Sequence, residues 1–191
     1  MIYPPEISNI LTELRHSGGE SGNAVGSDAN FSCGSFVRFR LNIDRELGTV
    51  KNAGFTSNGC GYMTAAAEIV SREISGKKLA GLHGLDDNTF DEPLSGSIGK
   101  CPLERANCRK AVFSAVRSAF ADFRSRQIEE FCGEKALVCT CFGITEEYIE
   151  NAIATRGLTT VDEVSLRTNA GSGCGSCRML IQEMLDAAEM G

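Results

Sequence analysis

Four cysteines in the last third of the chain have the type and spacing of a metal or iron–sulfur site. One residue separates Cys139 from Cys141, two separate Cys174 from Cys177, and residues 142–173 lie between the pairs. Four thiolates delivered as two close pairs can bind one zinc ion in a closed tetrahedral shell or the two irons of a [2Fe–2S] cluster. Glycine lies within two residues of three of these cysteines, which lets the backbone bend around a bulky inorganic group.

The choice between zinc and iron–sulfur depends on how the pairs are presented. A zinc ribbon usually carries two Cys-x-x-Cys turns on hairpins. Here one pair is Cys-x-Cys, and both pairs lead directly into helix-like sequence. The pattern favours a [2Fe–2S] cluster. Structural zinc is the first alternative, and four unrelated buried thiols that bind no metal are the second.

The residues around the two pairs resemble a known family. They are similar to the [2Fe–2S] domain of bacterioferritin-associated ferredoxin and to the central domain of NifU proteins, over residues 139–145, 156–164 and 171–177. The resemblance implies a permanent, redox-active [2Fe–2S] cluster. Its ligands would be Cys139, Cys141, Cys174 and Cys177.

Length and composition restrict the class of protein. The 191 residues suffice for one ordinary domain or two small ones, and a hydrophobic content of 42% supports real cores. The net charge of −6 argues against nucleic acid or an anionic membrane as a partner. We find no membrane-spanning run and no signal peptide, so we expect a cytoplasmic protein. In that reducing setting, nine cysteines indicate metal binding or catalysis rather than disulfides.

The first two thirds of the chain read as a mixture of helices and antiparallel strands. Apolar spacing predicts helices near residues 5–14, 62–75 and 108–123, and alternation predicts a hairpin from 37–43 and 49–57. Residues 17–30 and 86–100 are rich in turn formers and are predicted to be loops. Residues 124–136 lose the helical periodicity.

The last third is predicted to be mainly helical. Thr145 can cap a helix that ends at Gly157, Thr159 or Thr160 can cap a second, and Ser176 precedes a third. The inward residues would be Tyr148, Ile149, Ala152 and Ile153 of the first helix, and Leu180, Ile181, Met184, Leu185 and Ala188 of the third. Two cysteine loops thus lie near helix N-termini, which favours an anionic cluster.

A second candidate site consists of Cys33, Cys60 and Cys108. Each begins or precedes a predicted strand or helix. Three thiols converging at one end of a small domain would leave a metal one protein ligand short, as in sites that exchange their fourth ligand. Spacing alone does not distinguish such a site from unrelated thiols.

Residues 3–125 resemble the U-type iron–sulfur scaffold, the fold of IscU and of the NifU N-terminal domain. The resemblance is carried by residues 22–26, 32–34 and 55–61 and by Cys108 at the head of a long helix. It implies an α+β fold: a scaffold domain of antiparallel strands packed with helices over residues 1–131, then a small, mainly helical [2Fe–2S] domain over 132–191. It also implies a transient [2Fe–2S] or [4Fe–4S] cluster, or zinc, on Cys33, Cys60 and Cys108.

The sequence departs from the family pattern at the presumed fourth-ligand positions. Ser35 stands where the family has an aspartate, and Asn107 where many members have a histidine. We hypothesise that Cys101, seven residues before Cys108, substitutes as an extra ligand. The third domain of a full NifU, which carries another Cys-x-x-Cys, is not found in the sequence up to Gly191.

These patterns together predict an iron–sulfur assembly scaffold rather than an enzyme. The resemblance implies sulfur from a cysteine desulfurase, cluster transfer to apo iron–sulfur proteins, an unidentified electron donor and a homodimer. No carboxylate pair, Ser/His/Asp arrangement or phosphate loop is present. The alternative is a [2Fe–2S] electron carrier or redox sensor whose scaffold domain no longer transfers clusters.

Overall fold

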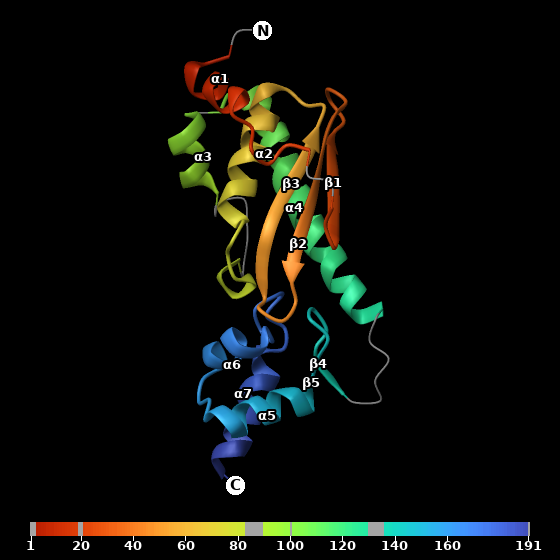
Figure 1. Cartoon of the computed structure of the whole chain (residues 1–191), viewed down its shortest axis with the longest axis vertical. Helices are drawn as coiled ribbons and strands as arrows, with labels where there is room; N and C mark the ends of the chain where they lie inside the picture. The colour runs from red at the N-terminus through yellow and green to blue at the C-terminus, as the bar shows by residue number, and fades with distance from the viewer. Residues whose placement is uncertain (1–2, 19–20, 83–89, 100, 130–135, 191) are drawn as a thin grey trace. The chain divides into compact units, whose positions relative to one another are not determined.

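The computed structural model describes residues 3–18, 21–82, 90–99, 101–129 and 136–190 (Figure 1). It has a mixed α+β fold, which confirms the predicted class. The chain divides into two compact units, the first made of Met1–Arg45, Thr49–Lys77 and Leu85–Asp122, the second of Glu46–Gly48, Lys78–Gly84 and Phe123–Gly191. The predicted boundary between residues 131 and 132 lies outside the described residues and stays a prediction.

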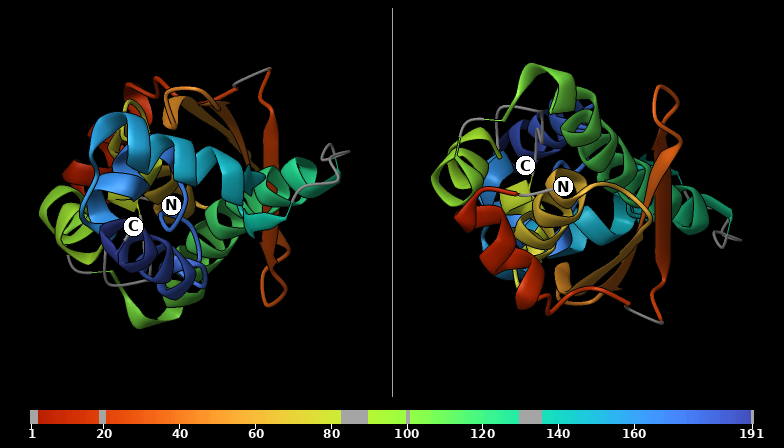
Figure 2. Two further views of the ribbon diagram at one scale, coloured as in Figure 1. Left: turned by 90° about the horizontal axis from the view of Figure 1, so that it is seen from below. Right: turned by 90° about the horizontal axis from the view of Figure 1, so that it is seen from above.

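The first unit is built on a three-stranded antiparallel sheet of order β1-β2-β3. Its strands are β1 (Ala24–Asn30), β2 (Ser35–Asp44) and β3 (Thr49–Ser57). The helices are α1 (Pro5–Thr12), α2 (Gly61–Ile74), α3 (Asp91–Ile98) and α4 (Ala106–Glu129), with 3-10 turns η1 (Leu79–Leu82) and η2 (Leu103–Arg105). The last turns of α4, and η1, fall in the second unit. Further views show the helices against the sheet (Figure 2).

The core of the first unit lies on one face of this sheet. Side chains of β2 alternate between the core and the solvent, because successive residues of a strand point to opposite faces. The fully buried ones include Val37, Phe39 and Leu41. Helix α2 packs on β3. Helix α4 lies so close to β1 that a Cβ on Gly26 would come within 2.2 Å of the Ala115 carbonyl oxygen. Glycine is therefore required there.

Two predicted loops were wrong. Residues 24–30 form β1, which pairs with β2 from Ala24↔Leu41 to Asn30↔Ser35. Residues 91–98 form α3, whose Leu94 and Ile98 are buried. In both segments the local residues favour turns, and pairing or burial against the rest of the unit overrides that preference. Helix α4 also continues to Glu129, beyond the point where its apolar periodicity ends.

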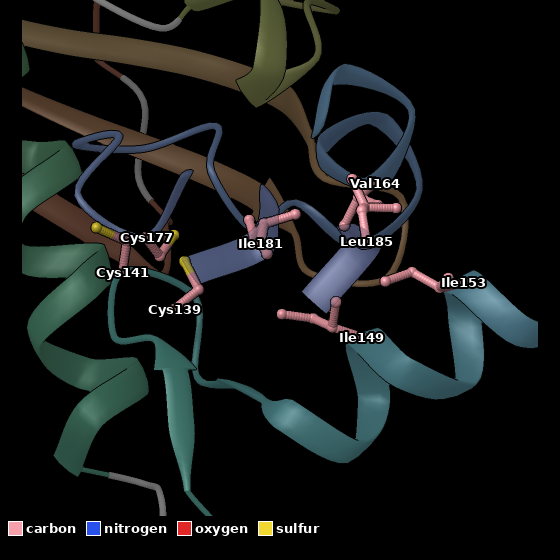
Figure 3. Close-up of a cluster of buried hydrophobic side chains, with 9 residues drawn as sticks. Cys139, Cys141, Ile149, Ile153, Val164, Cys177, Ile181 and Leu185 are labelled. Atoms are coloured by element: carbon pink, nitrogen blue, oxygen red, sulfur yellow. The ribbon is translucent and has the colours of Figure 1, made fainter. Parts of the chain in front are cut away.

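The second unit holds a short hairpin and three helices. These are β4 (Leu137–Cys139), β5 (Ile144–Thr145), α5 (Glu146–Arg156), α6 (Val161–Thr168) and α7 (Arg178–Met190). The predicted caps are confirmed: Thr145 accepts from the Tyr148 N–H, Thr160 forms a capping box with Glu163, and Gly157 is left-handed with φ of 59°. A small apolar core joins the three helices (Figure 3).

The prediction of which residues of these helices are buried was wrong in part. Ile149, Ala152, Ile153, Ile181 and Leu185 are buried, as expected. Tyr148 and Leu180, however, are 53% and 49% exposed, and Ala188 is exposed. Three short helices bury only a narrow stripe each, so positions at the stripe's edge stay in solvent. No helix among the described residues is long and apolar enough to span a membrane.

Candidate metal centres

Four cysteines of the second unit come together at one end of its apolar core. Cys139 ends β4, Cys141 lies in the turn before β5, and Cys174 and Cys177 lie in the loop before α7. The sulfurs of Cys141 and Cys174 are 3.3 Å apart. Cys139 accepts a hydrogen bond from the Cys141 thiol and donates one to the sulfur of Cys177. Figure 3 shows Cys139, Cys141 and Cys177 gathered beside the helix that carries Ile181.

Close approach of the two cysteine loops depends on Gly173. A Cβ at this position would lie 2.9 Å from the Cβ and 3.0 Å from the sulfur of Cys141. Real Cβ atoms essentially never approach another atom within 3.0 Å, so a side chain here would push the loops apart. Glycine at this position therefore lets the loop that carries Cys174 pack against Cys141.

Backbone N–H groups point at these sulfurs. The Gly171 amide donates to Cys139 and Cys177, and the Cys174 amide donates to Cys141. The hydrogen bond from Cys139 lowers the pKa of Cys177 to about 7, whereas the hydrogen bond with Cys139 and burial raise the pKa of Cys141 far above its usual range. Such amides stabilise sulfur-centred negative charge, and hydrogen bonds to cluster sulfurs tune the potential of iron–sulfur centres.

The donor set suits either a [2Fe–2S] cluster or one zinc ion. Four sulfurs can bind two irons, with two thiolates on each, or one tetrahedral zinc. Two thiolates on one tetrahedral iron or zinc are about 3.8 Å apart for a metal–sulfur bond of about 2.3 Å. The Cys141–Cys174 separation of 3.3 Å is shorter than this for both metals.

Three cysteines of the first unit also meet, at one end of their unit. Cys33 lies in the turn after β1, Cys60 is the N-cap of α2, and Cys108 is in the first turn of α4. The sulfurs of Cys60 and Cys108 are 3.8 Å apart. That is about the separation of two thiolates on one tetrahedral metal. Cys33 also hydrogen-bonds Cys108, although the three do not form a preformed metal shell.

Exposure falls steeply across this three-cysteine site. Cys33 is exposed, Cys60 is intermediate, and Cys108 is 1% exposed. Burial raises the pKa of Cys108, whereas hydrogen bonding to Ser35 lowers that of Cys33. An accessible, readily ionised thiol thus lies next to a buried one.

The proposed substitute ligand, Cys101, lies at the margin of this site. Its thiol is 3.6 Å from the Pro102 carbonyl oxygen. Burial, and to a smaller extent the nearby Cys60, raise its pKa. Cys101 is thus within electrostatic range of Cys60, and its role as a ligand stays a prediction.

The two departures from the family pattern have different surroundings. The Ser35 hydroxyl is 3.2 Å from the sulfur of Cys33, so Ser35 contacts a candidate ligand. Asn107 is exposed and lines an open groove of about 390 Å³ together with Lys110 and Arg117. The structure thus brings Ser35 into contact with a thiol and places Asn107 on an exposed groove.

Two further residues next to the thiols were missed in the sequence. Asn30 donates from its side-chain amide to the sulfur of Cys108 at 3.5 Å. The Arg105 guanidinium hydrogen-bonds Cys108, and the neighbouring thiols of Cys60 and Cys108 raise its pKa. Arg105 is three residues before Cys108, which is a detectable signal. Asn30 and Cys108 are 78 apart in sequence, so no local signal connects them.

Comparison with known proteins places both units. Residues 2–130 match the NifU-like N-terminal domain, and residues 137–187 match the BFD-like [2Fe–2S]-binding domain. The nitrogen fixation protein NifU of Azotobacter chroococcum mcd 1 is 27% identical over 96% of this chain, and that of Azospirillum brasilense 29% over 97%. The chain covers 58% and 59% of those proteins' lengths.

One solved structure covers both units. The crystal structure of the N-terminal part of a nitrogen-fixing NifU-like protein from Brucella abortus covers 94% of each chain, with 16% identity and a TM-score of 0.37. A likeness this loose supports no argument about the sites. The family match over residues 2–130 spans more than half of the sequence. The family resemblance is thereby confirmed: this chain belongs to the family of the NifU-like N-terminal domain, and it continues into a BFD-like [2Fe–2S]-binding domain.

Proposed function

We propose that this protein is a scaffold on which iron–sulfur clusters are assembled and from which they pass to apo-proteins. A transient cluster would form on Cys33, Cys60 and Cys108. The observation that carries the proposal is the 3.8 Å separation of the Cys60 and Cys108 sulfurs beside the exposed Cys33. Two ligands at metal-binding separation and a third in solvent make an open site, which can accept and release its cargo.

Sulfur would enter at Cys33. Its thiol is exposed, and hydrogen bonding to Ser35 lowers its pKa, so it is a ready nucleophile. The Cys33 thiolate would attack the terminal sulfur of a desulfurase persulfide, forming a Cys33 persulfide and releasing the desulfurase thiolate. Reduction of that sulfur to sulfide needs two electrons from an external reductant. The Arg105 guanidinium beside Cys60 and Cys108 offsets the negative charge that accumulates there.

Cys139, Cys141, Cys174 and Cys177 would hold the permanent cluster. When bound, a [2Fe–2S] cluster there accepts and donates one electron at a time. Burial of Cys139, Cys141 and Cys177 keeps water and competing ligands away, and the amides of Gly171 and Cys174 stabilise the sulfurs. This enclosure supports retention rather than transfer.

The proposal extends to setting and assembly. We place the protein in the cytoplasm, where a reducing setting keeps thiols available for metal. A homodimer would let two open sites face each other and combine two [2Fe–2S] units into one [4Fe–4S], a coupling that takes two electrons from the external reductant. Without iron and sulfide, the three-cysteine site would bind zinc.

The test uses anaerobically purified full chain. We expect a red protein with about two irons per chain, in keeping with one [2Fe–2S] centre, and a one-electron paramagnetic signal that Cys139→Ala removes. Incubation with a cysteine desulfurase, cysteine, iron and a reductant should add iron and sulfide, which an apo-ferredoxin then takes up. A chain that keeps all its iron would instead be an electron carrier or redox sensor. Zinc without sulfide would refute the electron-transfer part.

A further inference from the structure

Asn30, at the end of β1, contacts both sides of the three-cysteine site. Its side-chain Nδ2 donates to the Cys108 sulfur at 3.5 Å, and its Oδ1 accepts from the Ser32 N–H at 3.1 Å. Its backbone oxygen accepts from the N–H groups of Cys33, at 3.2 Å, and Gly34, at 2.9 Å. One residue thus organises the turn that carries Cys33 and also reaches the sulfur of Cys108.

The two ends of the Asn30 side chain have fixed roles. The Ser32 N–H needs an acceptor, so the amide oxygen must face it, and the NH₂ group must then face Cys108. Asn30 is 9% exposed, and a buried amide with both ends hydrogen-bonded is satisfied without a charge. Aspartate would keep the oxygen and lose the N–H donor, and serine is too short to reach both partners.

The sulfur that Asn30 contacts is the one with least access to water. Cys108 is 1% exposed, so its thiolate depends on protein donors to replace lost hydration. Two such donors are present, the Asn30 amide and the Arg105 guanidinium. Groups that hydrogen-bond a metal ligand orient it and tune the metal.

We propose that Asn30 is a positioning residue that ties the Cys33 turn to the Cys108 sulfur and thereby sets how long the three-cysteine site keeps its metal or cluster. This inference rests on the proposed function of that site. The amide–sulfur bond holds the buried ligand in place while the exposed Cys33 exchanges. Weakening the bond should leave assembly possible but shorten the life of the product.

The principal variant is Asn30→Asp in the full chain with its permanent cluster intact. It keeps the side-chain shape and the acceptor for the Ser32 N–H, and it removes the donor to Cys108. We expect zinc affinity, measured by competition with a chromophoric chelator, to fall about tenfold, as for other outer-shell partners. The half-life of cluster transfer to apo-ferredoxin should shorten in parallel. The matched control is Asn52→Asp, the same change at an exposed residue of β3, which should alter neither quantity.

A spectroscopic readout separates positioning from general stability. With NMR-active Cd²⁺ bound to the site, the wild-type protein should show a coupling between the metal and the Asn30 side-chain amide protons, transmitted through the Cys108 sulfur. Should Asn30→Asp fail to fold, Asn30→Ser retains a polar acceptor for the turn without reaching Cys108, and it should weaken zinc binding similarly.

The outcomes distinguish this inference from the proposed function. If wild type assembles and transfers clusters, and Asn30→Asp matches Asn52→Asp or binds zinc more tightly, the inference is overturned and the function stands. If wild type assembles nothing, the function fails, while the zinc and Cd²⁺ measurements still test Asn30. No zinc bound at Cys33, Cys60 and Cys108 in wild type would overturn the inference as well.

Discussion

The two cysteine sites differ in how much of their sulfur is buried. Among the four proposed ligands in the second unit, three thiols are 1–6% exposed, and only Cys174 is exposed. In the first unit only Cys108 is buried among the three proposed ligands. Enclosed thiolate shells are typical of structural sites, whereas open ones exchange a ligand. The same ligand chemistry can thus serve retention in one unit and release in the other.

Each site also has one exposed cysteine beside a serine two residues further on. The sulfur-to-hydroxyl distances are 3.2 Å for Cys33–Ser35 and 3.1 Å for Cys174–Ser176. In both sites the exposed cysteine also contacts a buried one. Cys174 is within 3.3 Å of Cys141, and Cys33, in a turn held by Asn30, hydrogen-bonds Cys108. Exposure of one thiol therefore does not distinguish the two sites.

The largest expected effect is loss of the permanent centre. Cys139→Ala should abolish the one-electron paramagnetic signal and the iron that survives chelation, because it removes a buried ligand at the end of β4. The additional iron acquired with a desulfurase should still be found. Loss of that labile iron as well would break the comparison, since the sites would then not be independent.

The converse change is Cys108→Ala. It should prevent uptake of extra iron and sulfide, because it removes the buried ligand 3.8 Å from Cys60. The permanent signal should keep its shape and intensity, as measured by paramagnetic resonance before and after incubation with the desulfurase. Transfer to apo-ferredoxin at the wild-type rate would refute the assignment of Cys108.

Cys101→Ala tests the extra-ligand hypothesis. If Cys101 is a fourth thiolate ligand, its removal weakens the binding of the cluster. We therefore expect less iron on the first unit and a faster transfer of the cluster to apo-ferredoxin. Iron analysis and transfer kinetics measure both quantities. If neither changes, Cys101 is only a neighbour of Cys60 and the labile site has three protein ligands.

Gly173→Ala sharpens the comparison by disturbing only the enclosed site. The added Cβ would meet the Cβ of Cys141 at 2.9 Å, so we expect the second unit to lose about 1–3 kcal/mol of unfolding free energy, as for other overpacked positions. The permanent cluster should lose its iron to a chelator faster than in the wild-type protein. Gly96→Ala is the control, because nothing lies within 4 Å of its added Cβ. Equal rates of iron loss to the chelator in both variants would contradict the role of Gly173 in the packing of the two cysteine loops.

The smallest expected effect comes from Thr160→Ala. It removes the side-chain acceptor of the α6 capping box and should cost about 1 kcal/mol of stability. Thermal unfolding of the second unit, followed by circular dichroism, measures it. The cluster's absorption spectrum should not change, because Thr160 does not contact a cysteine. A spectral change would show that helix stability and cluster geometry are coupled.

The sequence alone predicts a good deal of both units, where the determinants are local. Alternation in residues 37–43 predicts β2, and the caps at Thr145, Thr160 and Gly157 are all confirmed. The family resemblance was confirmed as well. The site residues themselves are supported by proximity and stay predictions.

The failures share one physical cause. β1 and α3 have local sequences that favour turns, and partners distant in sequence stabilise them instead. Tyr148 and Leu180 follow the helical spacing of their buried neighbours but fall outside the narrow contact stripes of short helices. Information about such partners is not contained in a local window.

Taken by itself, the sequence determined which cysteines are candidate ligands and which metals thiolates of that spacing suit, because pairing at one- and two-residue spacing is a local property. Only the tertiary structure decided which thiols are enclosed, that Cys60 and Cys108 lie 3.8 Å apart, and that Asn30 reaches Cys108. These distances join residues 48 and 78 positions apart. They are set by the packing of β1, α2 and α4, which no local pattern specifies.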